Sequence, residues 1–115
     1  MSLTIYHNPN CSKSRQTLEL LKKNGIEPII IEYLKTPPTK EKLTEILAKP
    51  GLKPRDLMRK KEEDYAECEL DNLSLSDDDL IDFMLKRPIL IERPIVLANG
   101  KAAIGRPPEQ VLDIL

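Results

Sequence analysis

"LTIYHNPNCSKSRQTLELLKKNGIEPIIIEY", residues 3–33, contains two β-rich runs separated by a stretch with helical spacing. The run 3–6 ends at a turn, and the second run, 28–33, is apolar enough to be a central strand. Between them, leucines recur on one helical face after Ser12, and Gly25 is well placed to end that helix in a left-handed conformation. The order β-α-β favours a right-handed crossover between two parallel strands.

The middle of the chain is predicted to be helical. Thr39 can cap one helix, and a short basic helix is expected around residues 54–60. Ser76 begins the clearest helix, because its hydroxyl and the three aspartates after it suit a helix N-terminus, and Pro88 stops this helix. The predicted buried face of this helix consists of Leu80, Phe83 and Met84.

The C-terminal part of the chain returns to strands. Asn99-Gly100, between the runs 95–98 and 101–104, is a strong hairpin signal, and a terminal helix is expected after the hairpin. The complete order predicts an α/β protein with a thioredoxin-like fold, in which a helical insertion separates a parallel β-α-β half from a β-β-α half. We expect a single domain over residues 1–115, because the sequence contains no repeats, low-complexity stretches or linkers.

The composition argues against several classes of partner. A net charge of −1 over 115 residues lacks the basic surplus of most nucleic-acid-binding domains. No apolar run approaches the roughly 18 residues that a membrane span requires, and the N-terminus has no secretory pattern. Two cysteines are too few for a disulfide scaffold. We therefore expect a cytoplasmic monomer with no nucleic-acid or membrane partner, no bound cofactor and no metal site.

Cys11 is the candidate nucleophile, because it directly precedes the first predicted helix. The free amides of a helix N-terminus stabilise a thiolate, and thiols in such positions have pKa values of about 3.5–7.5. Ser14, one turn along, could donate a hydroxyl hydrogen bond to that thiolate, and His7 and Lys13 could add positive charge. Cys11 could instead be an inert apolar residue, but its polar, turn-forming neighbours favour a reactive thiol.

The sequence is less specific about the roles of two other residues. His7 could be a general base or a partner of the thiolate, or it could only satisfy the turn after the first strand. Cys68 lies in the acidic segment "DYAECELDN", for which a structural role is the better prediction.

Arginines provide a candidate anion site. Arg93 and Arg106 bracket the predicted hairpin, so both lie at its open end and can converge in space. The bond between Arg93 and Pro94 could be cis, which would bring the chain close to the thiol. Guanidinium groups beside a thiolate would bind a tetrahedral oxyanion. Arg59 is a third candidate, although its spacing does not place it in this site.

Four motifs carry a family resemblance over nearly the whole chain. They are "YHNPNCSKSRQTLELL" (6–21), "LMRKKEEDY" (57–65), "ERPIV" (92–96) and "IGRPPE" (104–109). In order and spacing they resemble the glutaredoxin-linked arsenate reductase family (ArsC-like), which belongs to the thioredoxin-like superfamily. Between the cysteine and the serine this chain has Ser12 and Lys13, where members of that family often carry glycine and threonine.

The resemblance implies roles for eight residues. The catalytic cysteine would be Cys11, and Pro94 would match the family's cis-proline. The three oxyanion-binding arginines would be Arg59, Arg93 and Arg106. The residues that support the thiol would be His7, Asn8 and Ser14.

The resemblance also implies the activity, which is reduction of arsenate to arsenite with glutathione as co-substrate and glutaredoxin as protein partner. Because Ser14 stands where redox motifs often have a second cysteine, a further thiol would have to come from another molecule. One alternative is a glutathione-linked thiol oxidoreductase with another substrate, which would need Cys11 but not the arginines. Another is an Spx-like regulator that binds RNA polymerase, although the C-x-x-C switch typical of those proteins is absent here.

Overall fold

The computed structural model describes residues 3–49 and 51–115, and within them the chain forms two compact units. The first unit combines the described residues up to Thr36 with Arg93–Leu115, and the second contains the described residues of Pro37–Glu92. Within these ranges, no helix has both the length and the apolar character needed to cross a membrane. The single domain over residues 1–115 stays a prediction.

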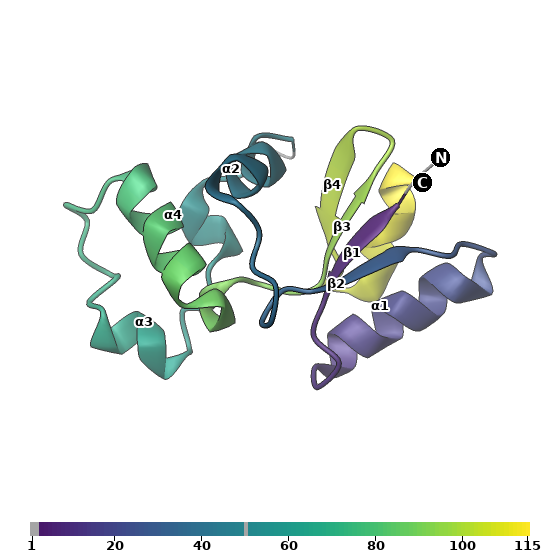
Figure 1. Cartoon of the computed structure of the whole chain (residues 1–115), viewed down its shortest axis with the longest axis horizontal. Helices are drawn as coiled ribbons and strands as arrows, with labels where there is room; N and C mark the ends of the chain where they lie inside the picture. Colours follow the sequence, from purple (N-terminus) through teal and green to yellow (C-terminus); the bar gives the residue numbers. More distant parts are fainter. Residues whose placement is uncertain (1–2, 50) are drawn as a thin grey trace. The chain divides into compact units, whose positions relative to one another are not determined.

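The first unit is a four-stranded mixed sheet with helices (Figure 1). Its elements are β1 (Thr4–His7), α1 (Ser12–Lys23), β2 (Ile29–Glu32), β3 (Ile95–Ala98), β4 (Lys101–Ile104) and the 3₁₀-helix η3 (Pro108–Ile114). The strand order is β2-β1-β3-β4, with β1 parallel to β2 and the other neighbours antiparallel. The β-α-β and β-β halves predicted from the sequence are therefore confirmed, and the strand limits of the hairpin agree residue for residue.

Helices α1 and η3 pack against one face of this sheet and against each other (Figure 1). Alternate strand residues point to that face, because successive side chains of a strand lie on opposite sides. The buried cluster formed there consists of Leu3, Ile5, Leu21, Val96, Ala98, Val111 and Ile114. This packing fixes the start of α1 at the carboxyl ends of the parallel strands, the edge where ligands bind in open α/β sheets.

Two sequence-based expectations for this unit were wrong in detail. Strand β2 is an edge strand and not a central one, and Ile29 and Ile30 are 55% and 45% exposed. A short apolar run has no periodicity that separates an edge from a centre, and β3 takes the other side of β1. The terminal helix is 3₁₀, and its buried residues Pro108, Val111 and Ile114 recur every three positions, the period of that helix.

The second unit is helical, and α4 (Asp77–Lys86) is its best-defined helix. The Ser76 hydroxyl accepts a hydrogen bond from the Asp79 amide at 3.1 Å, and the Asp79 carboxylate accepts one from the Ser76 amide at 3.0 Å. This reciprocal cap confirms the predicted helix start and satisfies two amides that a helix end leaves unpaired. The buried residues of α4 are Leu80, Ile81 and Met84, whereas Phe83, predicted to be buried, is only partly so.

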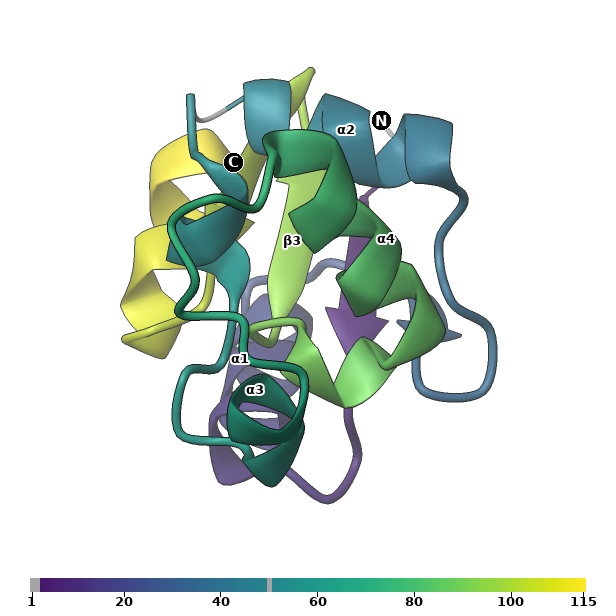
Figure 2. The ribbon, with the colours of Figure 1, turned by 90° about the vertical axis from the view of Figure 1, so that its left-hand side faces the viewer.

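The other elements of this unit are also helical. They are α2 (Lys40–Ala48), α3 (Glu63–Glu67) and the 3₁₀-helices η1 (Pro54–Leu57) and η2 (Pro88–Leu90). Helix α4 packs against α2, η1 and η2, and α3 packs against η2 (Figure 2). Thr39 caps α2 as predicted, accepting a hydrogen bond from the Lys42 amide. The basic helix expected around residues 54–60 is only the short η1.

Gly105 marks a close approach between the hairpin and α1. A Cβ atom at this position would lie 2.5 Å from Thr17 Oγ1 and 2.7 Å from Pro94 Cγ, both closer than real contacts allow. The Gly105 amide also donates a hydrogen bond to the Pro94 carbonyl oxygen at 2.9 Å. The missing side chain therefore lets the end of β4 pack directly on α1 and on Pro94.

Gly105→Ala should lower the free energy of unfolding by about 1–3 kcal/mol, because the added methyl group overpacks this contact. Urea denaturation of the variant and the parent measures the loss. Adding Thr17→Ala removes Oγ1, so the double variant should lose less than the sum of the two single losses. Strict additivity would show that the added methyl group does not clash with Thr17.

Candidate active site

Cys11 lies in the loop after β1 and is the N-cap residue of α1. Its amide donates to the Asn8 carbonyl oxygen at 3.0 Å, and its carbonyl oxygen accepts from the Arg15 amide at 3.0 Å. The residue is 9% exposed and is not in a disulfide. The position predicted for the thiol, at the first turn of a helix, is therefore what the structure shows.

The pKa of Cys11 is lowered from its ordinary value, although burial acts in the opposite direction and raises it. The Ser14 amide lowers this pKa most, followed by the hydrogen bond and positive charge of Arg93 and then by the Lys13 amide. These two amides favour the charged form of the sulfur as hydrogen-bond donors at the helix start, although neither makes a capping hydrogen bond of ordinary geometry. The thiolate is favoured because cations and amides outweigh the cost of burying it.

Two of the predicted arginines lie beside this sulfur. Arg106 Nη2 is 3.7 Å from Cys11 Sγ, and Arg106 Nε donates to the Arg93 carbonyl oxygen at 2.8 Å. Arg93 is 9% exposed, and its guanidinium lowers the pKa of the same thiol. The bond from Arg93 to Pro94 is cis, as the sequence suggested, and so is the bond from Arg106 to Pro107. The convergence expected at the open end of the hairpin is present.

The Ser14 hydroxyl makes different contacts from those expected. It lies 2.6 Å from His7 Nδ1 and accepts a hydrogen bond from the Asn8 amide at 3.0 Å, and Ser14 is fully buried. The expectation that this hydroxyl would donate to the thiolate is thus wrong, and the Ser14 backbone amide acts on the thiolate instead. A hydroxyl and an amide occupy different directions around the same residue, which spacing alone cannot separate.

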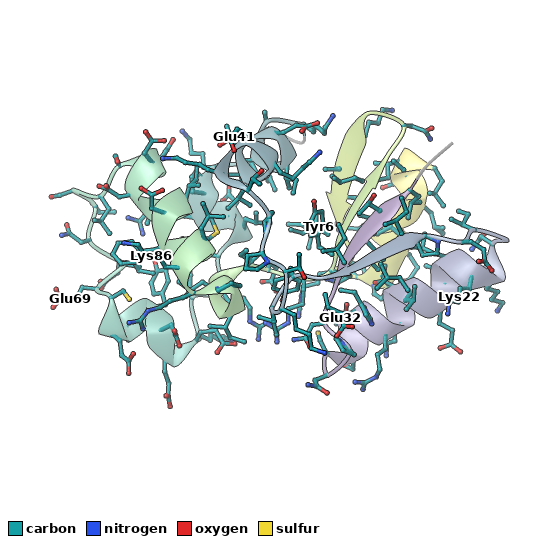
Figure 3. All side chains as sticks on the ribbon, in the orientation of Figure 1. Tyr6, Lys22, Glu32, Glu41, Glu69 and Lys86 are labelled. Carbon is teal, nitrogen blue, oxygen red and sulfur yellow. The ribbon has the colours of Figure 1, made fainter. Side chains whose placement is uncertain are left out.

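His7 is buried at the end of β1, and burial is the largest cause that lowers its pKa. Glu32 acts in the opposite direction, and Arg15 and Lys22 lower the pKa further. Figure 3 shows Glu32 at the end of β2, whereas Lys22 lies near the far end of α1. With the ring proton on Nε2, Nδ1 accepts a hydrogen bond from the Ser14 hydroxyl, and with the proton on Nδ1 the ring donates to the hydroxyl oxygen.

The loop between β1 and α1 is held by its own side chains. Asn8, which is 5% exposed, accepts a hydrogen bond from the Asn10 amide through Oδ1 at 3.0 Å. Arg15 reaches back and donates from Nη1 to the Pro9 carbonyl oxygen at 2.8 Å. The sequence reasoning did not identify Arg15, although a cation four residues after the nucleophile lies one turn along the same helix face.

Arg59 belongs to the second unit, where it forms ion pairs with Glu62 and Glu92. Its share in an oxyanion site with Arg93 and Arg106 stays a prediction. Neither carboxylate was predicted from the sequence, although the i,i+3 spacing of Arg59 and Glu62 favours an ion pair. Cys68, in the same unit, is a partly buried free thiol at the C-cap of α3.

The pH dependence of Cys11 alkylation should have its midpoint below about 8.5, the value of a free thiol. Because the lowered pKa is that of an acid, the thiolate and the alkylation rate should increase as the pH rises through this midpoint. Arg93→Gln keeps most of the side-chain volume and removes the charge, so its midpoint should be higher than that of the parent. Rates measured with Cys68→Ser in the background report Cys11 alone.

Two further variants test whether the shift in the alkylation midpoint is specific to Arg93. Lys23→Ala removes a positive charge from the exposed last turn of α1 and should leave the midpoint unchanged. Ser14→Ala retains the backbone amide and should shift the midpoint less than Arg93→Gln does. A parent midpoint at or above 8.5 would rule out an activated thiol.

Comparison with known proteins identifies close relatives of this chain. Residues 6–114 match the model of the ArsC family. The "Uncharacterized protein YfgD" of Escherichia coli is 56% identical over 112 residues, which cover 96% of this chain and 94% of that protein. An arsenate reductase of Escherichia coli is 50% identical over 114 residues, which cover 99% of this chain and 81% of that protein.

The fold comparison agrees with the sequence comparison. A structure described as an arsenate reductase from Vibrio cholerae superposes with a TM-score of 0.97 at 55% identity, covering 100% of this chain and 98% of that one. This agreement confirms the predicted thioredoxin-like α/β fold. Family model, relatives and structure together show that the chain belongs to the ArsC family.

Proposed function

We propose that this protein is an arsenate reductase in which the Cys11 thiolate attacks arsenate, with glutathione and glutaredoxin as the reductants. The observation that carries the proposal is the guanidinium of Arg106, 3.7 Å from a sulfur whose pKa is lowered. A reactive thiol alone would suit many thiol enzymes. Guanidinium groups beside it add a site for an oxyanion, which is what arsenate requires. The 50% identity to an arsenate reductase supports the same substrate.

Binding would begin with the oxygens of arsenate on N–H donors. Arg106 and Arg93 supply charge-assisted hydrogen bonds at the hairpin end, and the first-turn amides of α1 supply further donors. Such contacts hold arsenic near the sulfur and offset the repulsion between a thiolate and an anion. Pro94, next to Arg93 in the chain and against Gly105, would shape this end of the site.

The covalent step forms one bond and breaks one. The Cys11 thiolate donates its electron pair to arsenic, and an As–O bond breaks, with the oxygen leaving as water once it has gained protons. Arsenic is still pentavalent in this adduct, so no electrons have been transferred to it. The arginines favour the step, because negative charge on the arsenic-bound oxygens grows as the sulfur attacks.

Reduction needs two electrons, which two thiols supply when they are converted to one disulfide. Position 14 carries a serine, so we assign these thiols to other molecules, one to glutathione and one to glutaredoxin. The products are arsenite, a mixed disulfide between glutathione and glutaredoxin, and Cys11 restored by hydrolysis of its bond to arsenic. His7, Asn8 and Ser14 would hold the loop that presents the thiol throughout these steps.

Arg59 is proposed as a third oxyanion-binding arginine on the strength of the family motif around it. If it shares the ligand with the other two, its removal should cost oxyanion binding without changing the alkylation midpoint of Cys11. That combination would separate a role on the substrate from a role on the thiol.

Arsenite formation with glutathione and glutaredoxin should require Cys11, and Cys11→Ser should abolish it. Arg106→Ala removes a charge-assisted contact of about 1.5–3 kcal/mol, so kcat/KM for arsenate should fall roughly tenfold to a hundredfold. Arg106→Lys should recover only part of this loss, because a point charge cannot reproduce the planar fork. Arsenite is measured directly as the product.

Lys101→Ala, which removes a cation from the exposed start of β4, is the matched control and should leave kcat/KM unchanged. Millimolar phosphate or sulfate should compete with arsenate. If the arginine variants matched the parent while Cys11→Ser lost thiol activity on glutathione mixed disulfides, the protein would be a glutathione-linked oxidoreductase of another substrate.

A further inference from the structure

The Arg59 guanidinium is held between two carboxylates of the second unit. Its Nε is 2.9 Å from Glu62 Oε1, and its Nη1 is 3.3 Å from Glu92 Oε1. The three side chains are 22–26% exposed, so all of them are largely withdrawn from water. Ion pairs in such positions are screened less than pairs on an open surface.

A short backbone pairing fixes this arrangement. The Arg59 amide donates to the Leu90 carbonyl oxygen, and the Glu92 amide donates to the Leu57 carbonyl oxygen, each at 2.7 Å. Met58 and Ile91 form the antiparallel bridge between these two hydrogen bonds, and both are buried. Arg59 thus lies opposite Leu90 and Glu92 opposite Leu57, so the side chains of Arg59 and Glu92, which are 33 positions apart in the sequence, meet diagonally across this pairing.

The two carboxylates are not equivalent. Glu62 is three residues after Arg59, its amide donates to the Arg59 carbonyl oxygen at 3.2 Å, and its carboxylate makes the shorter contact. Glu92 makes the longer contact from a separate segment. If one carboxylate is exchanged for another anion, the local Glu62 contact is the one that should remain.

Both carboxylates around Arg59 act against the binding of another anion. Two carboxylates lie within hydrogen-bonding reach of the Arg59 guanidinium and place negative charge beside it. An oxyanion approaching the guanidinium meets the repulsion of both glutamates, whose oxygens already use the Nε donor and a donor on Nη1. The Glu92 oxygen on Nη1 would thus compete with an oxyanion oxygen for the donors on that side of the guanidinium.

We propose that Glu92 is a competing internal anion at Arg59 and weakens oxyanion binding, because its carboxylate repels the oxyanion and already uses a donor on Nη1. This inference rests on the proposed function only in giving Arg59 an oxyanion ligand. Glu92 then raises the oxyanion concentration at which Arg59 binds its ligand. Glu62 keeps the guanidinium in place while the exchange occurs.

The test uses inorganic phosphate, which binds as a tetrahedral oxyanion and does not react with the thiol. Phosphate is titrated into the full-length protein labelled with nitrogen-15, and the arginine Nε–Hε resonances are followed by NMR. Glu92→Gln retains the size of the side chain and an oxygen that can accept from Nη1, but it removes the negative charge. Its Kd for phosphate should be roughly threefold to tenfold lower than that of the parent, with the Arg59 resonance shifting on binding.

Two further variants isolate the pair. Glu63→Gln makes the same charge change at an exposed residue beside Glu62 and should leave the Kd within about twofold of the parent. In an Arg59→Ala background, Glu92→Gln should produce no gain, because the competition requires the guanidinium. A gain that persisted without Arg59, or that Glu63→Gln reproduced, would be a general charge effect and would overturn the proposal.

The remaining outcomes also decide the question. An unchanged or higher Kd in Glu92→Gln would make Glu92 a structural partner of Arg59, and absence of phosphate binding in both parent and variant would overturn the proposal as well. The titration does not depend on turnover. The proposed function can therefore fail, through absence of Cys11-dependent arsenite formation, while the competition at Arg59 is still observed, and the reverse can also occur.

Discussion

The hydrogen bond from Arg106 Nε to the Arg93 carbonyl oxygen holds together the two ends of the β3–β4 hairpin, and the candidate site depends on it. Arg93 precedes β3 and Arg106 follows β4, so the hairpin brings both guanidinium groups to one end of the sheet. The Gly105 amide donates a second hydrogen bond, to the Pro94 carbonyl oxygen. Because Gly105 has no side chain, α1 can lie close to this end of the hairpin. The cations therefore reach the sulfur because the hairpin ends are fixed, and not because the arginine side chains are long.

The thiol at Cys11 shows how opposing electrostatic effects are balanced. Burial disfavours a thiolate, and at 9% exposure Cys11 would be expected to remain protonated if it had only apolar neighbours. The amides of the first helical turn and the guanidinium of Arg93 reverse this preference. The first turn of α1 contains no acidic residue, which would compete with the thiolate for the same positive end of the helix. The local sequence is thus consistent with a helix start that favours an anion.

Much of this arrangement could be predicted from the sequence where a single residue type has a strong local preference. Asn99 and Gly100 both have positive φ, the conformation that a two-residue hairpin needs, and they fixed the limits of β3 and β4. The position of Cys11 at the start of α1 followed from similarly local signals. The order of strands across the sheet did not, since the isoleucines of β2 suit an edge as well as a centre. The contacts of the Ser14 hydroxyl and the pairing of Arg59 with Glu92 were not predicted either, because side-chain direction and long-range pairing leave little trace in spacing.

Ser14 gives a structural reason for a chemistry with one active-site cysteine. Its hydroxyl, fully buried, both contacts the His7 ring and accepts the Asn8 amide, so it connects α1 to the loop that carries Cys11. A thiol is larger and is a weaker hydrogen-bonding group, so a cysteine at position 14 would leave these buried polar partners poorly satisfied. Its sulfur would also be enclosed, out of reach of an incoming substrate. The packing around Ser14 therefore disfavours a second thiol beside Cys11, which agrees with the proposal that the reductants come from other molecules.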